Sequence, residues 1–389
     1  MKRITVLKQT ILIGLLVGLL APVIGQDMHL PATTKSKEAK ALYVEAANAL
    51  YDVEFPKAFE LTAKALKADP DFFMGHFFNT FNGDKALRDA SMDKMVAYTG
   101  KLNKGEKVIK EIAVKRKENP KYKAVEDWRK VAELYPKNIF PKAILVNQLT
   151  GSEETLDEAL SLLDECLALN PELPFVYNSK GYIYLAKKDY KSAENAFDQY
   201  IKVAPDKANP YDSKGEYFME VKEYEKAAEH FKKAYDINKE FTFSKKSQKQ
   251  AEWMTKRIVI TKEVETSMDA LVEAYNLRDM GKYTKFYLNS PEFCFVMNGE
   301  VMDSYSEFVK NTYKSKEKYT EWKVEMLKQS IEIPAENIAT VTQIFSYKAT
   351  PVEGDKVDDK GSYTTIWRKN DGKWKVVQVI EVFPLIESM

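Results

Sequence analysis

Small and aromatic residues recur along this chain at an interval of 34 positions. The same kinds of side chain return in the same order, as Tyr177, Gly181, Tyr184, Ala193 and Phe197 and then as Tyr211, Gly215, Phe218, Ala227 and Phe231. Self-similarity of this period is typical of stacked helix pairs, in which each unit buries its apolar side only against its neighbours. Small residues allow close contact between helices, and aromatic side chains fill the space between them. The pattern therefore predicts an all-α helical solenoid.

The repeat register extends beyond these two copies, although less regularly. Ala159 and Pro171 stand 34 positions before Ala193 and Pro205, which indicates a further copy ahead of them. We therefore predict three regular units, at residues 140–173, 174–207 and 208–241.

The first part of the predicted helical domain is less uniform. A similar unit spans residues 39–72, with alanines and a proline at the corresponding sites. Residues 73–139 keep helical spacing but lose the register, so they are either divergent repeats with an insertion or a helical connector. The predicted repeat domain covers residues 36–250, and a linker or capping helix follows at 251–263.

The residues Tyr177, Gly181, Tyr184, Ala193, Phe197 and Pro205 resemble the tetratricopeptide repeat (TPR) consensus. The resemblance covers roughly residues 39–238, strongly in the last two copies and weakly in the middle. The resemblance implies a right-handed superhelix with a concave groove that holds peptides or partner proteins. Carried over to this chain, the groove positions are Phe175, Asn178, Tyr182, Asn209, Asp212 and Glu216. None of them is Lys or Arg, so a ligand held by its C-terminal carboxylate is disfavoured. A groove that holds the chain's own residues, or water, remains an alternative.

From residue 264 onward the apolar pattern changes. Two amphipathic helical segments come first, at residues 264–275 and 280–287. A short apolar run then follows at residues 293–297, and alternating or β-rich runs follow at 322–326, 338–347, 363–369 and 374–382. The turn Asn370-Asp371-Gly372-Lys373 joins the last two runs and is a strong β-hairpin signal. This order predicts a second domain, at residues 264–389, of the α+β class with helices first and an antiparallel sheet afterwards.

The second domain resembles the NTF2-like superfamily, and within it the SnoaL-like or DUF4440-type group. The likeness rests on short motifs in the family's order: Phe293-Cys294-Phe295 before Asn298-Gly299, Glu307-Phe308, Ala339-Thr340-Val341-Thr342, and Trp367-Arg368-Lys369 leading to Trp374-Lys375-Val376-Val377. The resemblance implies a cone, in which a curved sheet wraps around a helix and encloses an apolar pocket. It also implies dimerisation through the open face of the sheet, as in many relatives.

A pocket inside this cone would take its lining from the aromatic and polar residues Tyr275, Phe295, Tyr305, Thr342, Tyr363, Trp367 and Gln378. Such a lining suits a small apolar or aromatic ligand held by one or two hydrogen bonds. The alternative is a filled core, because tryptophan and tyrosine at alternating strand positions are often packing residues.

No catalytic residue is assigned in this domain. The only histidines, His29, His76 and His230, precede it, and Gln378 and Ile380 stand where relatives often carry histidine. A histidine acid or base inside the cone is therefore excluded. Carboxylates remain available, namely Asp269, Glu273, Asp279, Glu292, Glu300, Asp303 and Glu381. An enzyme would need one of these to point into a cavity and to pair with Tyr or Asn.

The N-terminus predicts export. Lys2, Arg3 and Lys8 precede an apolar stretch at residues 11–20, which is shorter than the ~20 residues that a spanning helix needs. We therefore predict a cleaved signal peptide at residues 1–25, a periplasmic or secreted protein, and no membrane span after cleavage.

Charge and motifs exclude several classes of function. The 59 Lys and Arg residues nearly balance the 58 Asp and Glu residues, and removing residues 1–25 leaves a net charge near −2. That balance argues against a nucleic-acid partner. The two cysteines, Cys166 and Cys294, lie in apolar contexts and are predicted to be buried free thiols. No phosphate-binding, metal-binding or cofactor motif is present, so we predict neither a metal nor a cofactor.

These observations predict an exported, non-enzymatic interaction protein. The solenoid would hold a protein or peptide partner, and the second domain would provide homodimerisation or the binding of a small apolar ligand. The alternative is an NTF2-like enzyme of the isomerase, dehydratase or hydrolase type, with the solenoid as its docking module.

Overall fold

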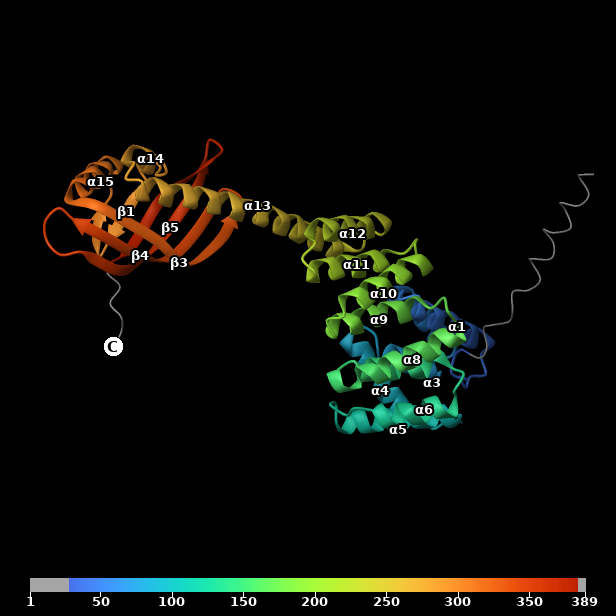
Figure 1. Cartoon of the computed structure of the whole chain (residues 1–389). Coiled ribbons are helices and arrows are strands. Elements are labelled where there is room, and N and C mark those ends of the chain that lie inside the picture. The colour runs from blue at the N-terminus through green and yellow to red at the C-terminus, as the bar shows by residue number, and fades with distance from the viewer. Residues whose placement is uncertain (1–27, 384–389) are drawn as a thin grey trace, which may run out of the picture. The chain divides into compact units, whose positions relative to one another are not determined.

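The computed structural model describes residues 28–383 (Figure 1), and the predicted signal peptide lies outside them. The chain forms two compact units, one ending at Gln248 and the other beginning at Lys249. Across the described residues, no helix combines the length and apolar character required to cross a membrane.

The first unit is built from helices that pack in consecutive pairs, which confirms the predicted helical region. The pairs are α1 (Lys37–Tyr51) with α2 (Phe55–Ala68), α3 (Phe73–Asn79) with α4 (Lys85–Ala97), α5 (Lys104–Glu118) with α6 (Val125–Leu134), α7 (Ile139–Leu149) with α8 (Leu156–Leu169), α9 (Pro174–Ala186) with α10 (Tyr190–Val203), and α11 (Ala208–Glu220) with α12 (Tyr224–Ile237). A short 3₁₀ turn at Glu153–Thr155 precedes α8. The irregular stretch 73–139 thus contributes helices that are themselves paired, α3 with α4 and α5 with α6.

The 34-residue interval has a packing cause. A Cβ atom added to Gly181 would lie 2.4 Å from Cε1 of Phe197, and one added to Gly215 would lie 2.7 Å from the ring of Phe231. Both phenylalanines are almost completely buried. In each copy, therefore, the first helix needs glycine because the aromatic ring of the second helix packs against its backbone.

A second recurring contact joins neighbouring repeats within the first unit. The hydroxyl groups of Tyr177 and Tyr211 each donate a hydrogen bond to the carbonyl of the proline six residues earlier, at 2.9 and 3.0 Å. His76 occupies the corresponding place near the start of the array, where Nε2 lies 2.9 Å from the Pro70 carbonyl oxygen. The same kind of contact is thus made near the start of the array as between its later repeats.

Helix α13 (Thr242–Asn276) extends across the division between the two units. It includes residues 251–263, which were predicted to be a linker or a capping helix and are helical throughout. The Lys-rich sequence around residues 242–262, which includes Gln248 and Gln250, is compatible with a solvated helix face, so composition alone does not distinguish a linker from a capping helix.

The second unit contains a six-stranded sheet in the order β2-β1-β6-β5-β4-β3. The strands are β1 (Cys294–Met297), β2 (Glu300–Met302), β3 (Tyr319–Ala335), β4 (Ile338–Pro351), β5 (Val357–Asn370) and β6 (Lys373–Val382). Two further helices, α14 (Met280–Thr284) and α15 (Tyr305–Lys318), complete the predicted α+β domain. Strand β1 pairs parallel with β6, so the sheet is mixed rather than purely antiparallel.

The predicted hairpin between the last two strands is confirmed. Asp371 and Gly372 have positive φ angles of 47° and 75°, as the two central residues of a type I′ turn require. Asn298 and Gly299 form a second turn of this kind between β1 and β2, with φ angles of 51° and 88°.

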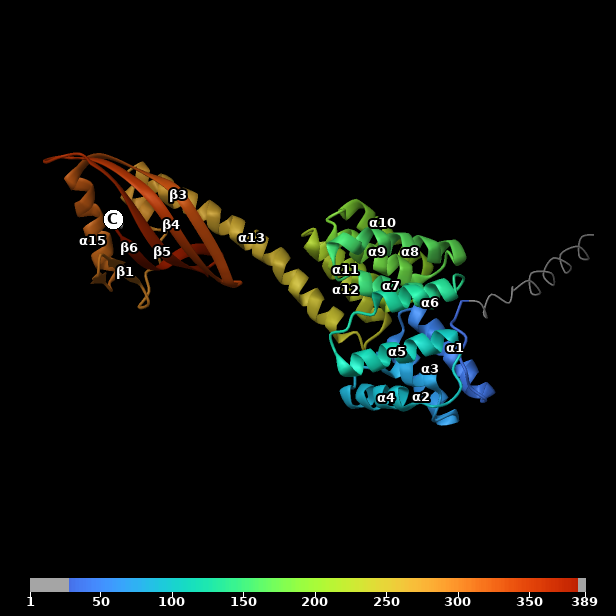
Figure 2. The ribbon, with the colours of Figure 1, turned by 90° about the horizontal axis from the view of Figure 1, so that it is seen from below.

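The core of the second unit lies between α13 and one face of the sheet (Figure 2). Ile260, Val264, Met268 and Leu271 form a buried stripe at helical spacing on α13 and pack against strand residues. Beside this stripe, Glu263 accepts hydrogen bonds from Lys369 Nζ at 2.6 Å and from Trp374 Nε1 at 2.9 Å. These bonds join the helix to both strands of the β5–β6 hairpin.

The two cysteines are free and lie in different units. Cys166 is fully buried, and burial raises the pKa of its thiol to about 12. Cys294 is only partly buried, so the prediction of two buried thiols fits Cys166 alone.

Candidate functional site

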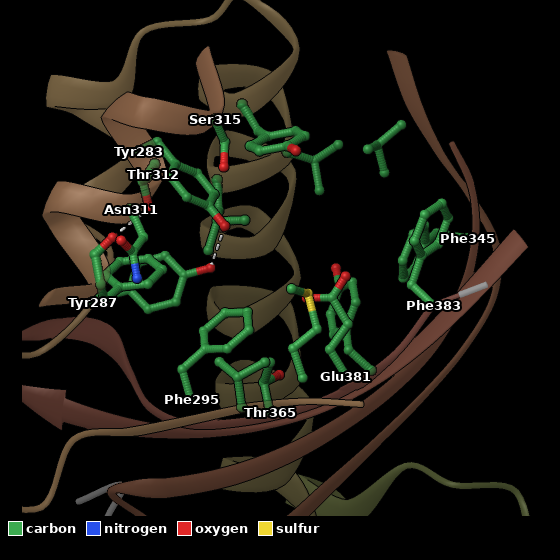
Figure 3. Close-up of a pocket in the computed structure, with 18 of the residues that line it drawn as sticks. Tyr283, Tyr287, Phe295, Asn311, Thr312, Ser315, Phe345, Thr365, Glu381 and Phe383 are labelled. Atoms are coloured by element: carbon green, nitrogen blue, oxygen red, sulfur yellow. Dashed lines mark hydrogen bonds between the residues drawn. The ribbon is translucent and has the colours of Figure 1, made fainter. Parts of the chain in front are cut away.

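The second unit contains a cavity of about 510 Å³ between its helices and the inner face of the sheet (Figure 3). Twelve of the side chains that line it are aromatic, and methionines contribute much of the rest. A volume of this size is within the ~300–1,000 Å³ range of small-molecule sites. The inside of the cone is therefore not the filled core that stood as the alternative.

Strand alternation directs the aromatic residues into the cavity. Phe345 and Tyr347 on β4, and Tyr363 and Trp367 on β5, occupy every second position and share the inner face. Gly361 makes room for one of them, because a Cβ atom at this position would lie 2.3 Å from Cζ of Phe345. The wall thus depends on one glycine as well as on the aromatic residues.

The end of α13 is bonded to strand β3 and fixes a second wall. Asn276 donates to the Val324 carbonyl at 2.9 Å and accepts from the Val324 N–H at 2.7 Å. Trp322 Nε1 donates to the Tyr275 carbonyl at 2.7 Å, and the two rings stack with centroids 5.0 Å apart. Backbone and side-chain contacts therefore hold these two rings in place.

Glu381 brings a carboxylate into this aromatic space. Figure 3 shows its side chain directed from β6 into the cavity, and it makes no hydrogen bond or ion pair with any residue in the described range. Burial raises its pKa from 4.5 to about 7. The other charged lining residues, Glu300 and Glu307, are exposed, and none of the described lining residues is Lys, Arg or His.

Of the predicted pocket residues, the structure brings Tyr275, Phe295, Tyr363 and Trp367 together around the cavity. Tyr305 does not line it. Its ring packs edge-on against Phe293, with centroids 5.7 Å apart, and its hydroxyl donates to the Thr284 carbonyl at 3.0 Å. Tyr305 is thus a packing residue of the adjoining core.

Thr342 and Gln378 also do not line the cavity, because both are exposed on the other face of the sheet. The error for Gln378 has a local cause. The β5–β6 pairing shifts by one residue at Val377, so the alternation that starts with Trp374 and Val376 changes phase. Val377 is consequently buried, and Glu381 rather than Gln378 takes an inner position.

Glu381 was one of seven carboxylates considered from the sequence, and nothing in the sequence distinguished it from the others. Tyr283 and Tyr287, which also line the cavity, were assigned only to a helical patch. Their hydroxyl oxygens are 2.6 Å apart and form a hydrogen bond. The helical spacing of four residues between them was the signal that could have placed both on one inner face.

The second unit contains a match to a known protein family. Residues 261–381 match the calcium/calmodulin dependent protein kinase II association domain. The match supports a C-terminal domain of the association, NTF2-like type, whereas no family match covers the helical repeats. No curated protein matches the chain.

Solved structures also resemble this part of the chain. An NTF2-like superfamily protein from Salmonella enterica serovar Typhimurium is 15% identical, with coverage of 34% of this chain and 96% of that one and a TM-score of 0.32. A putative association domain of the same kinase family from Xanthomonas campestris is 20% identical, with coverage of 32% and 88% and a TM-score of 0.29. A putative scytalone dehydratase from Novosphingobium aromaticivorans is 12% identical, with coverage of 33% and 85% and a TM-score of 0.31. These likenesses do not assign a function.

The face of the sheet opposite the cavity has no charged residues at its centre. Across three rows of β4, β5 and β6, the outward positions carry only Thr, Ser, Ile, Val and Gln. Thr342 and Thr364 pair across two of these strands, with hydroxyl oxygens 3.2 Å apart. Ile380 and Val382 on β6 are 57% and 44% exposed. We call this surface the outer sheet face.

The first unit has a cavity of its own, of about 700 Å³, and three of the predicted groove residues line it. They are Phe175, Asn178 and Tyr182 of α9. The remaining lining includes Phe55, Phe59 and Phe81, which sequence reasoning did not select, and it contains no charged residue among those described. Phe81 could have been selected from the sequence, because it forms an aromatic cluster with Phe77 and Phe78.

Asn209, Asp212 and Glu216 do not line this cavity, and each bonds to the chain itself. Asn209 donates to the Tyr200 hydroxyl at 2.9 Å, and Asp212 accepts a hydrogen bond from Ser244. Glu216 accepts one from the Tyr182 hydroxyl at 2.6 Å. Burial raises the pKa of both carboxyl groups.

The array also contacts itself over a long sequence distance. Phe175 of α9 packs against Tyr51 of α1, with ring centroids 5.6 Å apart. Lys207 forms an ion pair with Glu54 at 2.8 Å, 153 positions away along the sequence. Part of the predicted groove is thus covered by the chain's own first helix pair, which was one of the alternatives left open by the sequence.

Metal binding finds no support within residues 28–383. No group of three or more His, Cys, Asp or Glu side chains is arranged there to hold a metal ion.

Proposed function

We propose that this protein is an exported, homo-oligomeric interaction protein. In this proposal the association-type domain joins copies of the chain, and the helical array holds an apolar segment of a partner protein. The match of residues 261–381 to an association domain is the observation that carries the proposal. The export step rests on the N-terminal sequence alone.

The outer sheet face has the properties that a contact between identical copies needs. A two-fold contact places the same patch of each copy against the other, so any charge near its axis meets a like charge. The centre of this face carries no charge, and its β-branched side chains lose little conformational freedom on contact. Burying Ile380 and Val382 would also remove exposed apolar surface from water.

A charge at the centre of the outer sheet face is expected to separate the copies. Ile380→Glu would bring two carboxylates together across a two-fold contact, and such like-charge contacts cost several kcal/mol. We expect the dissociation constant of the Ile380→Glu oligomer to be about 100-fold or more above that of the wild type. Light scattering during size-exclusion chromatography of the full chain measures this change.

Ile258→Glu is the matched control, because Ile258 on α13 is also 57% exposed but lies outside the outer sheet face. This variant should retain the wild-type mass. Circular dichroism melting shows whether each variant is folded. A wild-type chain that is monomeric at micromolar concentration, or an oligomer that persists in Ile380→Glu, contradicts the proposal.

The cavity of the first unit supports the partner-binding half of the proposal. Its walls are apolar and aromatic, and the side-chain amides of Asn147 and Gln148 can pair with both N–H and C=O groups of an extended peptide. With no Lys or Arg in the lining, the geometry favours an apolar peptide segment over a terminal carboxylate.

Filling this cavity is expected to abolish peptide binding. Ala143→Trp places an indole in the cavity, and Ala97→Trp on the exposed end of α4 is its control. The probe is a phage-displayed library of random decapeptides selected on the wild-type chain. Selected peptides should contain an apolar residue and should bind Ala143→Trp at least about tenfold more weakly, but Ala97→Trp equally. Equal binding to both variants, or selection of peptides for their terminal carboxylate, contradicts this part of the proposal.

The enzyme alternative needs a carboxylate paired with Tyr or Asn inside the cavity of the second unit. Glu381 reaches that cavity, but it has no such hydrogen-bonding partner among the residues that the structure describes. A carboxylate without a second acid–base group does not complete a proton-transfer site. We therefore favour the interaction function over an isomerase, dehydratase or hydrolase.

A further inference from the structure

The cavity of the second unit has a one-sided charge. Its three charged lining residues, Glu300, Glu307 and Glu381, are all acidic, and no described lining residue carries a positive charge. An anionic ligand would meet repulsion and would lose its hydration without a compensating partner. The electrostatics of the cavity thus disfavour anions.

The aromatic lining is itself suited to a positive charge. The faces of Tyr and Trp rings are electron-rich and attract organic cations within ~6 Å of the ring centre. Trp322 of β3 stacks on Tyr275 and already carries the Arg278 guanidinium 4.7 Å from its ring centroid, so it is not counted among them. Tyr275 of α13, and Tyr347 and Tyr363 of the sheet, also line the cavity with such rings. Together with Glu381, they surround the space with groups that attract a cation and with apolar surface.

The position of Glu381 adds a specific counter-ion. Burial is the largest cause of the raised pKa of five tyrosines on both sides of the cavity, and the negative charge of Glu381 raises each pKa further. These tyrosines are Tyr275, Tyr283, Tyr287, Tyr347 and Tyr363. Glu381 has no ion-pair partner among the described residues. An unpaired carboxylate in an apolar space is costly, and a bound cation would remove that cost.

We propose that this cavity binds a small organic cation, an ammonium group carried on an apolar body, with Glu381 as its counter-ion. A metal ion does not fit the same space, since the described residues offer one inner carboxylate rather than a set of oxygen ligands. This binding is additional to oligomerisation, and its test does not depend on the mass of the oligomer.

Three aromatic probes of similar size separate the ligand classes: benzyltrimethylammonium, neutral 2-phenylethanol and anionic phenylacetate. Isothermal titration calorimetry on the full chain at pH 8 is expected to show the cation binding at least about tenfold more tightly than the alcohol. Phenylacetate should show no binding. Equal affinity for the cation and the alcohol, or tighter binding of the anion, overturns the proposal.

Glu381→Gln removes the charge and keeps the shape of the side chain. This variant should bind the cation at least about tenfold more weakly and the alcohol unchanged. Its matched control is Glu353→Gln, at an exposed position between β4 and β5. Loss of affinity for both probes in Glu381→Gln would show a collapsed cavity, and unchanged affinity for the cation would overturn the role of Glu381.

The pH dependence of the wild-type chain tests the same role without any substitution. Benzyltrimethylammonium keeps its charge at every pH, so only the protein titrates. The pKa of Glu381 is raised to about 7 and the surrounding tyrosines stay neutral from pH 5 to 8. Affinity should therefore fall as the pH is lowered through 7 and should approach that of Glu381→Gln at low pH. A flat profile in the wild type contradicts the proposal.

Discussion

Gly181→Ala is expected to destabilise the helical unit by about 2–4 kcal/mol. The added Cβ atom would lie 2.4 Å from Cε1 of Phe197, far inside a normal contact distance. The ring cannot move away easily, because it is fully buried and also packs edge-on against Tyr182, with centroids 5.3 Å apart. Overpacking of this kind outweighs the better helix propensity of alanine, which favours it over glycine by about 1 kcal/mol.

Urea unfolding followed by circular dichroism at 222 nm measures this loss in the full chain. Gly151→Ala is the control, because a Cβ atom there has no neighbour within 4 Å and the backbone does not have a positive φ. It should be neutral or slightly stabilising. In the double variant Gly181→Ala with Phe197→Leu, the smaller side chain should restore part of the stability. If Gly181→Ala and Gly151→Ala unfold alike, the 34-residue interval does not have the packing cause given above.

The helix pairs could be predicted from the sequence because their packing repeats. Gly181 and Phe197 recur as Gly215 and Phe231 with the same contact, so a short-range pattern reports the tertiary structure directly. The β5–β6 hairpin was equally visible, since two positive φ angles are needed at a two-residue turn. Local chemistry determines both features.

Other features depend on contacts that leave no local signal. The pairing of Lys207 with Glu54, and with it the partial closure of the groove, joins residues 153 positions apart. The bulge at Val377 changes the phase of β6 without any glycine or proline to mark it. The pocket residues predicted from their chemical type therefore included Gln378, and Glu381 could not be distinguished from the other carboxylates.

Glu381→Gln is expected to stabilise the second unit at high pH and to have little effect at low pH. The pKa of Glu381 is raised from 4.5 to about 7 in the folded chain, so the folded state binds this proton more tightly than the unfolded state. The contribution of the protonated Glu381 carboxyl to the stability of the folded state is complete below pH 4.5 and is lost as the pH rises through 7. The loss is on the order of 3 kcal/mol between these limits.

The difference in unfolding free energy between Glu381→Gln and the wild type should thus grow from near zero at pH 4.5 to about 3 kcal/mol at pH 8. Urea unfolding of both chains across this range measures it. Buried carboxyl groups of the first unit, such as Asp212 and Glu216, titrate in both chains and cancel from the difference. Glu353→Gln should show no such growth, because that carboxyl is exposed. A difference that is constant with pH would mean that water entering the cavity solvates the Glu381 carboxylate, and the same water would then compete with a bound cation.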